Sequence, residues 1–404
     1  MIRFTRLLHG KGTVSQAIKH RHSAPTDAPT EVLAFTETRR PVIFWNITNK
    51  CNLSCHHCYI NAGPDAMREN ELTTEESKAF IDDVAEMGVP LLLFTGGEPL
   101  IRPDFWELAS HAKGKGLRTV ISTNGTLITK DVAKRLQDIG IQYVGVSLDG
   151  ADPATHDAIR NQKGAYEGAI QALKNCVEIG LKSGIRVTAH KSNFKEIPEM
   201  LEMALDLGVP RFCLYWLVPS GRGIEGYLEN QLNKDEIEET LDYLYTKARD
   251  LDPEVIEILT VDAPQDGIYL LNRMKEENHP EYENAYKLLS MTGDSCSAGD
   301  RVANVDPVGN VYPCQFSQRP DYCVGNIRET TFGEMWNDPE NDILNKFRAK
   351  KDNLNGICKA CSNMDLCGGG CRIRGLNQHG EIWAEDSFCE FGGVDRLVQS
   401  NSGE

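Results

Sequence analysis

The stretch PVIFWNITNKCNLSCHHCY, residues 41–59, runs from an apolar segment directly into three closely spaced cysteines. Its first seven residues have the apolar, partly β-branched composition of a buried strand. Cys51, Cys55 and Cys58 then follow in a C-x3-C-x2-C spacing. A four-iron cubane cluster normally takes four thiolates, so three cysteines from one tight loop would leave one iron open to chelate a small molecule. A zinc site that adds a neighbouring histidine is the alternative.

Five more short apolar runs follow the first, and helical patterns separate them. The first of these helices is well marked, because Thr73 and Glu76 form a capping box, Phe80 and Val84 lie on one face, and Gly88 ends it. Alternating strands and helices indicate an α/β fold with a parallel sheet and right-handed crossovers. Six repeats favour a partial, open (β/α)6 barrel over a closed eightfold one. The predicted strands are PVIFWNI, PLLLFTG, RTVIST, QYVGVSL, GIRVTAH and RFCLYWL.

Unusual residues gather where the predicted strands end. The cysteines follow the first strand, and Gly96-Gly97-Glu98-Pro99 ends the second. Thr123-Asn124-Gly125 ends the third strand, and Ser147-Leu148-Asp149-Gly150 ends the fourth. In parallel α/β folds the reactive groups lie at the carboxyl ends of the strands, so these segments are the candidates for a functional site.

The bulk composition limits the class of protein. The 404 residues include 40% hydrophobic ones, enough for a sizeable core, and carry a net charge of −16. An acidic chain is a poor binder of nucleic acid or of an anionic membrane. No apolar run is long enough for a membrane span, and the N-terminal segment lacks the apolar run typical of a signal peptide, so we expect a cytoplasmic protein. The odd number of cysteines, 13, argues against a disulfide framework in such a chain.

Eight of the cysteines lie between residues 296 and 389, in a second region rich in glycine and cysteine, and seven of them, all but Cys323, form the clustered set. A zinc ribbon is one explanation for such short fixed spacings, and iron–sulfur ligation is the other. Cys176 and Cys213 lie within predicted helix and strand patterns, where a core position is expected. The predicted organisation is a leader (1–40), the partial barrel (41–235), a helical bridge (236–289), the cysteine-rich domain (290–392) and a tail (393–404).

Over about residues 41–235, these motifs resemble the radical S-adenosylmethionine (SAM) superfamily. The resemblance implies a [4Fe-4S] cluster on the three cysteines, with S-adenosylmethionine at its open iron. Such a cofactor pair generates a 5′-deoxyadenosyl radical, which takes a hydrogen atom from an unactivated carbon. A ferredoxin-like carrier or a structural zinc protein would need none of these strand-end motifs. The implied contacts are His57 near the adenine, Gly96, Gly97 and Glu98 at the methionine amino group, Asn124 and Ser147 at the ribose, and Arg186 at the methionine carboxylate.

The C-terminal region resembles the SPASM extension, which follows the barrel in many radical SAM enzymes and carries auxiliary clusters. The resemblance implies one or two auxiliary [4Fe-4S] clusters beside the barrel. Cys323 is a further candidate ligand, although a loop cysteine without a role is the simpler interpretation. The implied ligand sets are Cys358, Cys361, Cys367 and Cys389 for one cluster, and Cys296, Cys314 and Cys371 for the other.

The whole chain also resembles the tetrapyrrole branch of the superfamily, which serves alternative haem and haem d1 formation. Segments such as LYWLVPSGRG and DRVANVDPVGNVYPCQF carry this resemblance. It implies an iron-porphyrin substrate, an unidentified low-potential electron donor and an oxygen-poor environment. Two reactions compete. One is oxidative decarboxylation of two propionates of iron-coproporphyrin III to vinyl groups, which forms protohaem, and the other is removal of two acetate side chains from 12,18-didecarboxysirohaem. A peptide maturase of the same superfamily is a third hypothesis.

The complete C-terminal cysteine set, with Cys314 included, favours the decarboxylation. Forming a vinyl group requires one more electron to leave the substrate radical, and a nearby auxiliary cluster is a natural acceptor. Both porphyrins carry carboxylates, so cations are expected in the pocket. The candidates are Arg222, Arg301, Arg3, Arg6 and Arg21, and His20 or His22 is a candidate ligand for a substrate iron.

Overall fold

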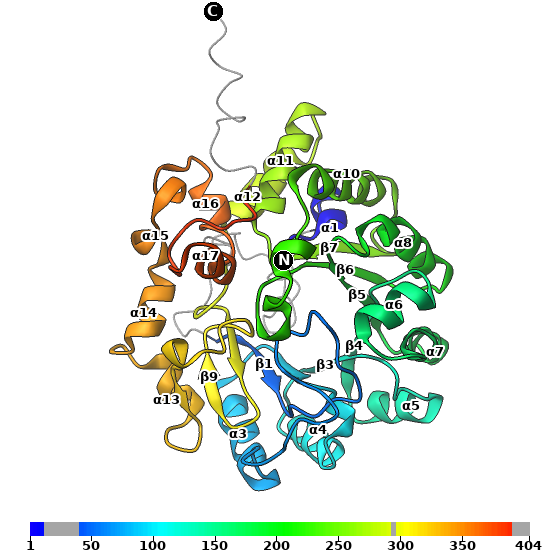
Figure 1. Cartoon of the computed structure of the whole chain (residues 1–404), viewed down its shortest axis with the longest axis vertical. Helices are drawn as coiled ribbons and strands as arrows, with labels where there is room; N and C mark the ends of the chain where they lie inside the picture. The colour runs from blue at the N-terminus through cyan, green and yellow to red at the C-terminus, as the bar shows by residue number, and fades with distance from the viewer. Residues whose placement is uncertain (12–39, 292–295, 390–404) are drawn as a thin grey trace, which may run out of the picture.

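The computed structural model describes residues 1–11, 40–291 and 296–389, which build one mixed sheet with helices packed around it (Figure 1). Strands β1 to β7 run parallel and pair in chain order. The first six coincide with the six predicted runs, which confirms the partial barrel. The bounds are β1 (Val42–Asn46), β2 (Leu92–Thr95), β3 (Thr119–Thr123), β4 (Ile141–Ser147), β5 (Ser183–Ala189), β6 (Arg211–Trp216) and β7 (Glu257–Val261).

Helices follow the strands and cover the outside of the curved sheet (Figure 1). The predicted first helix is α3 (Thr74–Met87), where the side chains of Thr73 and Glu76 form the expected capping box. Gly88 ends this helix in the left-handed conformation, with φ 73°. The apolar faces of these helices and the strands share one continuous core. The other covering helices are α4 (Phe105–Gly114), α5 (Lys130–Asp138), α7 (Ala165–Glu178), α8 (Ile197–Asp206) and α10 (Lys234–Asp250).

The segment predicted as a helical bridge contains a strand as well as helices. Strand β7 lies between α10 and α11 (Gln265–Glu276), and α12 (Tyr282–Met291) follows. The run begins with Glu257, a charged residue that hides the strand pattern in the sequence. In the structure the Glu257 carboxylate is buried and forms ion pairs with Arg3 and Arg211. The additional strand therefore extends the sheet beyond the six strands that the sequence predicts.

The beginning of the predicted leader packs against β7. Ile2 and Thr260 exchange two backbone hydrogen bonds of 2.8 and 2.9 Å. Helix α1 (Phe4–Leu8) then packs on β7 and α10, with Phe4 and Leu7 buried. Residues 1–11 thus cover the free edge of the sheet at β7, which protects its unpaired backbone groups.

The cysteine-rich region extends the same sheet at its other edge. Strand β8 (Val302–Val305) pairs parallel with β1, while β9 (Asn310–Tyr312) and β10 (Gly325–Asn326) follow antiparallel. The barrel and the C-terminal region therefore share one ten-stranded sheet. The short helices beyond it are α13 (Phe332–Asn337), α14 (Asp342–Arg348), α15 (Lys350–Asn353), α16 (Met364–Cys367) and α17 (Arg372–His379). In the described segments, no helix is both long and apolar enough to cross a bilayer.

Candidate active site

One cavity of about 160 Å³ brings the predicted site residues together. Its wall includes the sulfur-bearing residues Cys51, Cys55 and Cys58 from the loop after β1. Strand ends complete the wall, as the topology predicts for the carboxyl edge of a parallel sheet. The predicted S-adenosylmethionine contacts on this wall are His57, Gly96, Gly97, Asn124, Ser147 and Arg186.

The two glycines after β2 are needed because the loop that carries the cysteines lies against them. A Cβ at Gly97 would meet the carbonyl oxygen of Lys50 at 2.0 Å, and one at Gly96 would meet that of Thr48 at 2.5 Å. Gly96 also has φ 133°, which L side chains rarely adopt. The Gly97 and Glu98 amides donate to the carbonyl oxygens of Thr48 and Lys50 at 2.7 and 2.9 Å. The backbone of this motif therefore holds the residues that directly precede Cys51.

Glu98 is fully buried and lies behind the wall of the cavity. Its two carboxylate oxygens accept hydrogen bonds of 2.9 Å from the Thr123 hydroxyl, and one of them also accepts from the Asn124 amide. Burial raises the pKa of this carboxyl to about 7, although these donors favour its ionised form. Glu98 thus fixes the end of β3 to the end of β2. Its direct contact with a methionine amino group stays a prediction.

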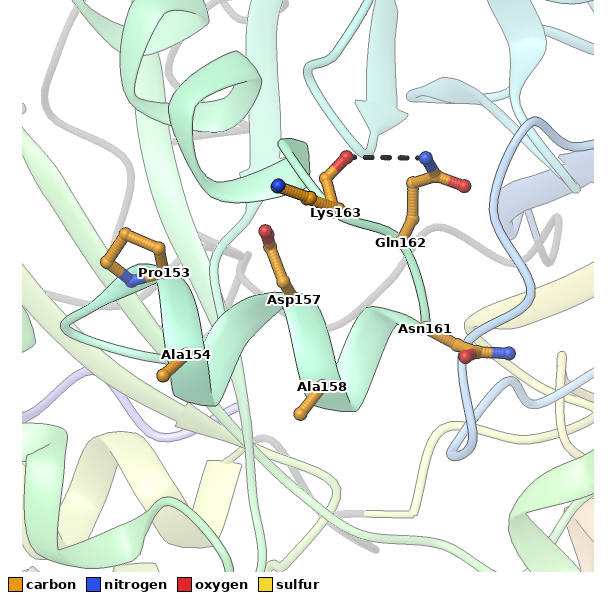
Figure 2. A pocket seen from close by; sticks show the side chains of 7 residues that line it. All are labelled: Pro153, Ala154, Asp157, Ala158, Asn161, Gln162 and Lys163. Carbon is orange, nitrogen blue, oxygen red and sulfur yellow. Dashed lines mark hydrogen bonds between the residues drawn. The ribbon is translucent and has the colours of Figure 1, made fainter.

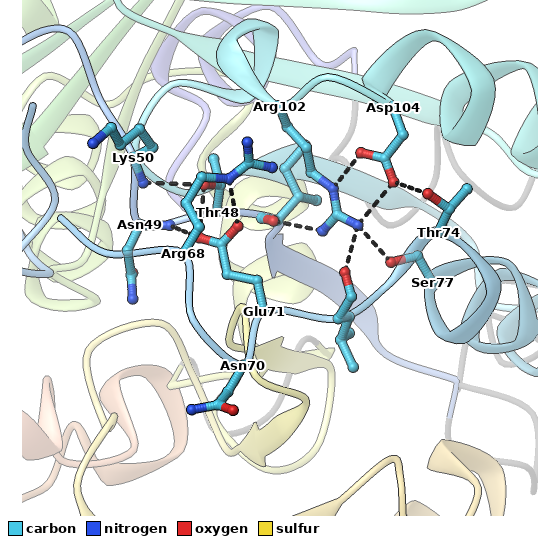
Figure 3. A network of polar contacts seen from close by, with 12 residues as sticks. Thr48, Asn49, Lys50, Arg68, Asn70, Glu71, Thr74, Ser77, Arg102 and Asp104 are labelled. Carbon is cyan, nitrogen blue, oxygen red and sulfur yellow. Dashed lines mark hydrogen bonds and ion pairs between the residues drawn. The ribbon is translucent and has the colours of Figure 1, made fainter.

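A polar network supports the start of the cysteine loop (Figure 3). Glu71 accepts hydrogen bonds from the Thr48 hydroxyl at 2.8 Å and from the Asn49 amide at 2.9 Å. Arg102, which is 3% exposed, donates to the carbonyl oxygen of Ile47 at 2.7 Å. Both side chains come from segments that follow the loop in sequence, so the loop is positioned by its surroundings as well as by its own turns.

Three donors point at the cysteine sulfurs. The Leu53 amide lies 3.4 Å from the sulfur of Cys51, and Nδ2 of Asn124 lies 3.9 Å from it. Nη1 of Arg160 lies 3.6 Å from the sulfur of Cys55. Donors of this kind stabilise negative charge on sulfur. Among the described residues, no group of three His, Cys, Asp or Glu side chains is arranged to hold one metal ion.

Asp149 is the centre of a charged network that the sequence does not reveal. Its carboxylate pairs with Nη2 of Arg160 at 2.5 Å and lies 3.2 Å from Nε2 of His57. Burial alone would raise the pKa of Asp149, but Arg160 and His57 hold this pKa below its usual value. The only sequence signal is the position of Asp149 just after β4. Its partner Arg160 is the last residue of a different element, helix α6 (Pro153–Arg160), so the pairing cannot be read from the sequence around Asp149.

Arg186 brings a positive charge into the cavity from β5. Its guanidinium carbon lies 4.6 Å from the centre of the Tyr215 ring, which fixes its plane. Its aliphatic stem crosses Gly145 on β4, where a Cβ would lie 2.5 Å from Cδ of Arg186. Ser147, next on the same face of β4, pairs in register with Arg186. The predicted pair at the ends of β4 and β5 is therefore adjacent in space.

The loop after β6 and the C-terminal region close the cavity. Nε of Arg222 donates to the carbonyl oxygen of Cys55 at 3.0 Å, and its Nη2 is buried without a hydrogen-bond partner in the described part of the chain. Gln315 and Phe316, which follow Cys314, also line the cavity. The Phe316 ring meets the Tyr59 ring edge-on at 5.9 Å. The cavity is thus built by both halves of the chain.

The auxiliary cysteines lie in two parts of the C-terminal region, and their division into two ligand sets stays a prediction. Cys296, Cys314 and Cys371 pack against one apolar cluster. Burial raises the pKa of Cys314 to about 12, and the neighbouring Cys296 and Cys371 act in the same direction. In the second part, burial raises the pKa of Cys367 and of Cys358; Cys389 and Cys358 act in the same direction on Cys367, and Cys361 does so on Cys358. Cys323 lies instead near Asp306 and donates to the carbonyl oxygen of Gly325 at 3.5 Å.

Several other predicted candidates lie away from the cavity. Arg3 is buried in its ion pair with Glu257, and Arg6 lies 4.0 Å from Glu254. Arg301 lies 3.8 Å from Asp300 and is not part of the cavity wall. The buried pairing with Glu257 on β7 thus makes Arg3 unavailable to a carboxylate substrate. Cys176 and Cys213 are buried, as expected, and Arg21, His20 and His22 fall outside the described residues.

A second hollow lies on the surface over α6 and the turn after it (Figure 2). Its acidic side chain, Asp157, accepts a hydrogen bond of 2.6 Å from the Gly164 amide and so stabilises the turn. Nδ2 of Asn161, which ends α6, donates to the Ser54 hydroxyl at 3.0 Å. These contacts make α6 a support for the cysteine loop, and we assign no ligand to the open surface above it.

Comparison with known proteins agrees with this arrangement. A model of the radical SAM superfamily matches residues 45–204, and one of the SPASM iron-sulfur cluster-binding domain matches residues 296–362. The Fe-coproporphyrin III synthase of Methanosarcina barkeri is 39% identical over 394 residues, which cover 96% of this chain and 97% of that protein. The AdoMet-dependent heme synthase of the same organism is 34% identical over 358 residues, 89% of this chain and 98% of that protein.

This chain belongs to the radical SAM superfamily and is a radical SAM enzyme with a SPASM domain. The family implies [4Fe-4S] clusters and S-adenosylmethionine as cofactors. The crystal structure of Streptococcus suis SuiB bound to S-adenosylmethionine has the same fold, with a TM-score of 0.68 at 18% identity. That match covers 93% of this chain and 86% of SuiB.

Proposed function

We propose that this chain forms Fe-coproporphyrin III by removing two acetate side chains from 12,18-didecarboxysirohaem. The observation that carries the proposal is the difference in similarity to two relatives from one organism. Identity is 39% over 96% of the chain to the Fe-coproporphyrin III synthase, against 34% over 89% to the heme synthase. Because both relatives come from Methanosarcina barkeri, distance between organisms does not explain that difference. Similarity to either relative supports the broader class, a radical SAM enzyme of haem biosynthesis.

The residues of the cavity fit a cluster that carries S-adenosylmethionine. Three thiols open on one cavity, and the Arg160 guanidinium points at the sulfur of Cys55. Nδ1 of His57 and Nη2 of Arg222 are buried there without a hydrogen-bond partner in the described segments, so each offers a donor or acceptor to a bound molecule. When bound, this cofactor pair would supply the radical that takes a hydrogen atom from the substrate.

Each predicted residue has a role in this proposal. Cys51, Cys55 and Cys58 hold the cluster, while the Gly96-Gly97 backbone and Arg186 receive the amino and carboxylate groups of methionine. Arg186 suits that task because a guanidinium binds a carboxylate with two parallel hydrogen bonds. The remaining contacts are His57 at the adenine and Asn124 and Ser147 at the ribose. The auxiliary ligands are Cys296, Cys314 and Cys371 for one cluster and Cys358, Cys361, Cys367 and Cys389 for the other.

A second candidate is the decarboxylation of two propionates of Fe-coproporphyrin III to vinyl groups. The complete C-terminal cysteine set favours it, because vinyl formation must pass one electron from the substrate to an acceptor. Acetate removal has the opposite need, since a released carboxymethyl radical must gain an electron and a proton. The two reactions therefore differ in the direction of electron transfer as well as in their products: vinyl formation releases an electron, and acetate removal consumes one.

The test is anaerobic incubation of the iron-loaded enzyme with didecarboxysirohaem, S-adenosylmethionine and a strong reductant, followed by mass analysis. We expect Fe-coproporphyrin III and two acetates per macrocycle. No change with this substrate, but loss of two CO2 from Fe-coproporphyrin III, would establish the second candidate instead. The variant with Cys51, Cys55 and Cys58 replaced by Ala should form no 5′-deoxyadenosine. Cys176→Ala is the matched control, because Cys176 is a buried cysteine of α7.

A further inference from the structure

Asp262, directly after β7, has a backbone conformation that residues other than glycine seldom adopt. Its φ is 71°, in the left-handed region, where the Cβ of an L residue crowds the following carbonyl oxygen. The carbonyl oxygen of Asp262 accepts a hydrogen bond of 2.6 Å from Nη2 of Arg374, which helps to hold this conformation. The Asp262 side chain lines the same cavity as Cys51 and Arg186. Surrounding contacts thus maintain an unusual turn that presents a carboxyl group to the cavity.

One oxygen of the Asp262 carboxyl makes no hydrogen bond within the described structure. Its Oδ2 is buried and has no hydrogen-bond partner among the described residues. The groups that face it are Arg186 from β5, Tyr215 from β6, Arg374 from α17 and the amino terminus of Met1. Burial raises the pKa of Asp262 to about 6, and the positive charges of Arg374, the amino terminus and Arg186 oppose the rise. A fraction of this carboxyl therefore carries a proton near neutral pH.

Asp262 also lies where the cavity meets the auxiliary cysteines. Arg374, which binds the Asp262 carbonyl, pairs with Asp386 through hydrogen bonds of 2.8 and 2.9 Å. Asp386 in turn accepts a hydrogen bond of 2.7 Å from the amide of Cys371. A continuous chain of hydrogen bonds therefore runs from the cavity to a predicted auxiliary ligand.

We propose that Asp262 is a catalytic residue that gives a proton to the acetate leaving the porphyrin. This assignment rests on the proposed function. Once a hydrogen atom has been taken from the ring carbon beside the one that bears the acetate arm, the bond to that arm breaks. A ring double bond and a carboxymethyl radical result. The radical gains one electron from the low-potential donor and one proton on its methylene carbon from the Asp262 carboxyl, which solvent then reprotonates.

Turnover of the iron-loaded enzyme in D2O tests this step, because the methyl hydrogens of acetate do not exchange with water. We expect one deuterium in each acetate released by the wild type. Acetate without deuterium would mean that 5′-deoxyadenosine returns its hydrogen, and the assignment would be overturned. In Asp262→Asn, acetate release should fall by about 10²-fold or more while 5′-deoxyadenosine still forms.

Two further measurements separate the outcomes. Asp266→Asn is the matched control, because burial raises the pKa of Asp266 to about 7 and its Oδ1, like Oδ2 of Asp262, is buried without a hydrogen-bond partner among the described residues, while its Oδ2 accepts a hydrogen bond of 2.7 Å from the Trp216 indole. Asp266 is not part of the cavity wall, so this variant should release acetate normally. Titration of didecarboxysirohaem by absorbance should give the same affinity for Asp262→Asn and wild type. If Asp262 had a purely structural role, its replacement would weaken this affinity. Unchanged acetate release in Asp262→Asn overturns this assignment alone, whereas no acetate from the wild type overturns the proposed function together with it.

Discussion

Replacing Gly97 by alanine should displace the loop that carries Cys51. A Cβ at this position would lie 2.0 Å from the carbonyl oxygen of Lys50, whereas ordinary contacts begin at 3.4 Å. The backbone at Lys50 would therefore have to retreat by about 1.4 Å. It is held against such a retreat by the hydrogen bonds from Gly97 and Glu98. Overpacking costs about 1–3 kcal/mol, and a misplacement of about 1 Å at a reacting centre costs on the order of 10²-fold in rate.

The assay is 5′-deoxyadenosine formation by the anaerobically reconstituted variant, together with its iron content and melting temperature. Gly63→Ala is the matched control, because Gly63 bridges to Lys50 and a Cβ there would meet nothing within 4 Å. We expect Gly97→Ala to lose roughly 10²-fold in rate, and Gly63→Ala to behave like the wild type. If Gly97→Ala retained the wild-type rate and iron content, the close approach of the two backbones would not govern the site.

Three further changes have defined outcomes. Arg102→Met should lower the free energy of unfolding of the metal-free protein by about 3–5 kcal/mol in a denaturant titration, because it leaves the buried partners of Arg102 unpaired. Arg68→Met is the control at an exposed pair and should change this free energy by less than about 1 kcal/mol. Cys358→Ala should lose the iron and sulfide of one auxiliary cluster, while Cys323→Ala should keep the full content measured by chemical analysis. Arg160→Gln should make the reduction potential of the barrel cluster more negative in an EPR-monitored titration, since it removes the donor 3.6 Å from the sulfur of Cys55.

Local sequence patterns predict most of the sheet, because a buried parallel strand is a nearly continuous apolar run. Strand β7, which the sequence does not predict, shows the limit of such local patterns. EILTV at 257–261 starts with a glutamate, and only Arg3 and Arg211, which are distant in sequence, make burial of that carboxylate possible. A pattern confined to a few neighbouring residues holds no information about such partners.

The candidate site, too, is predicted where local patterns suffice and missed where residues distant in sequence converge. Strand ends and cysteine spacing locate the cavity, because topology alone brings the carboxyl ends of parallel strands to one edge. The network of Asp149, Arg160 and His57 depends on side chains from three separate elements that happen to converge. The conformation of Asp262 has no local signal either, since nothing in its short sequence context requires a positive φ.

The position of the auxiliary region bears on how the reaction is organised. Strand β8 pairs directly with β1, so the auxiliary cysteines are attached to the sheet that positions Cys51. Phe316, two residues after Cys314, meets the ring of Tyr59, which directly follows Cys58. A linker between independent domains would let the distance between the two metal sites vary, whereas a shared sheet fixes it. A substrate in the cavity would therefore lie against both halves of the chain at once. Hydrogen-atom removal and the later electron step can then share one binding event, without release or reorientation of the porphyrin.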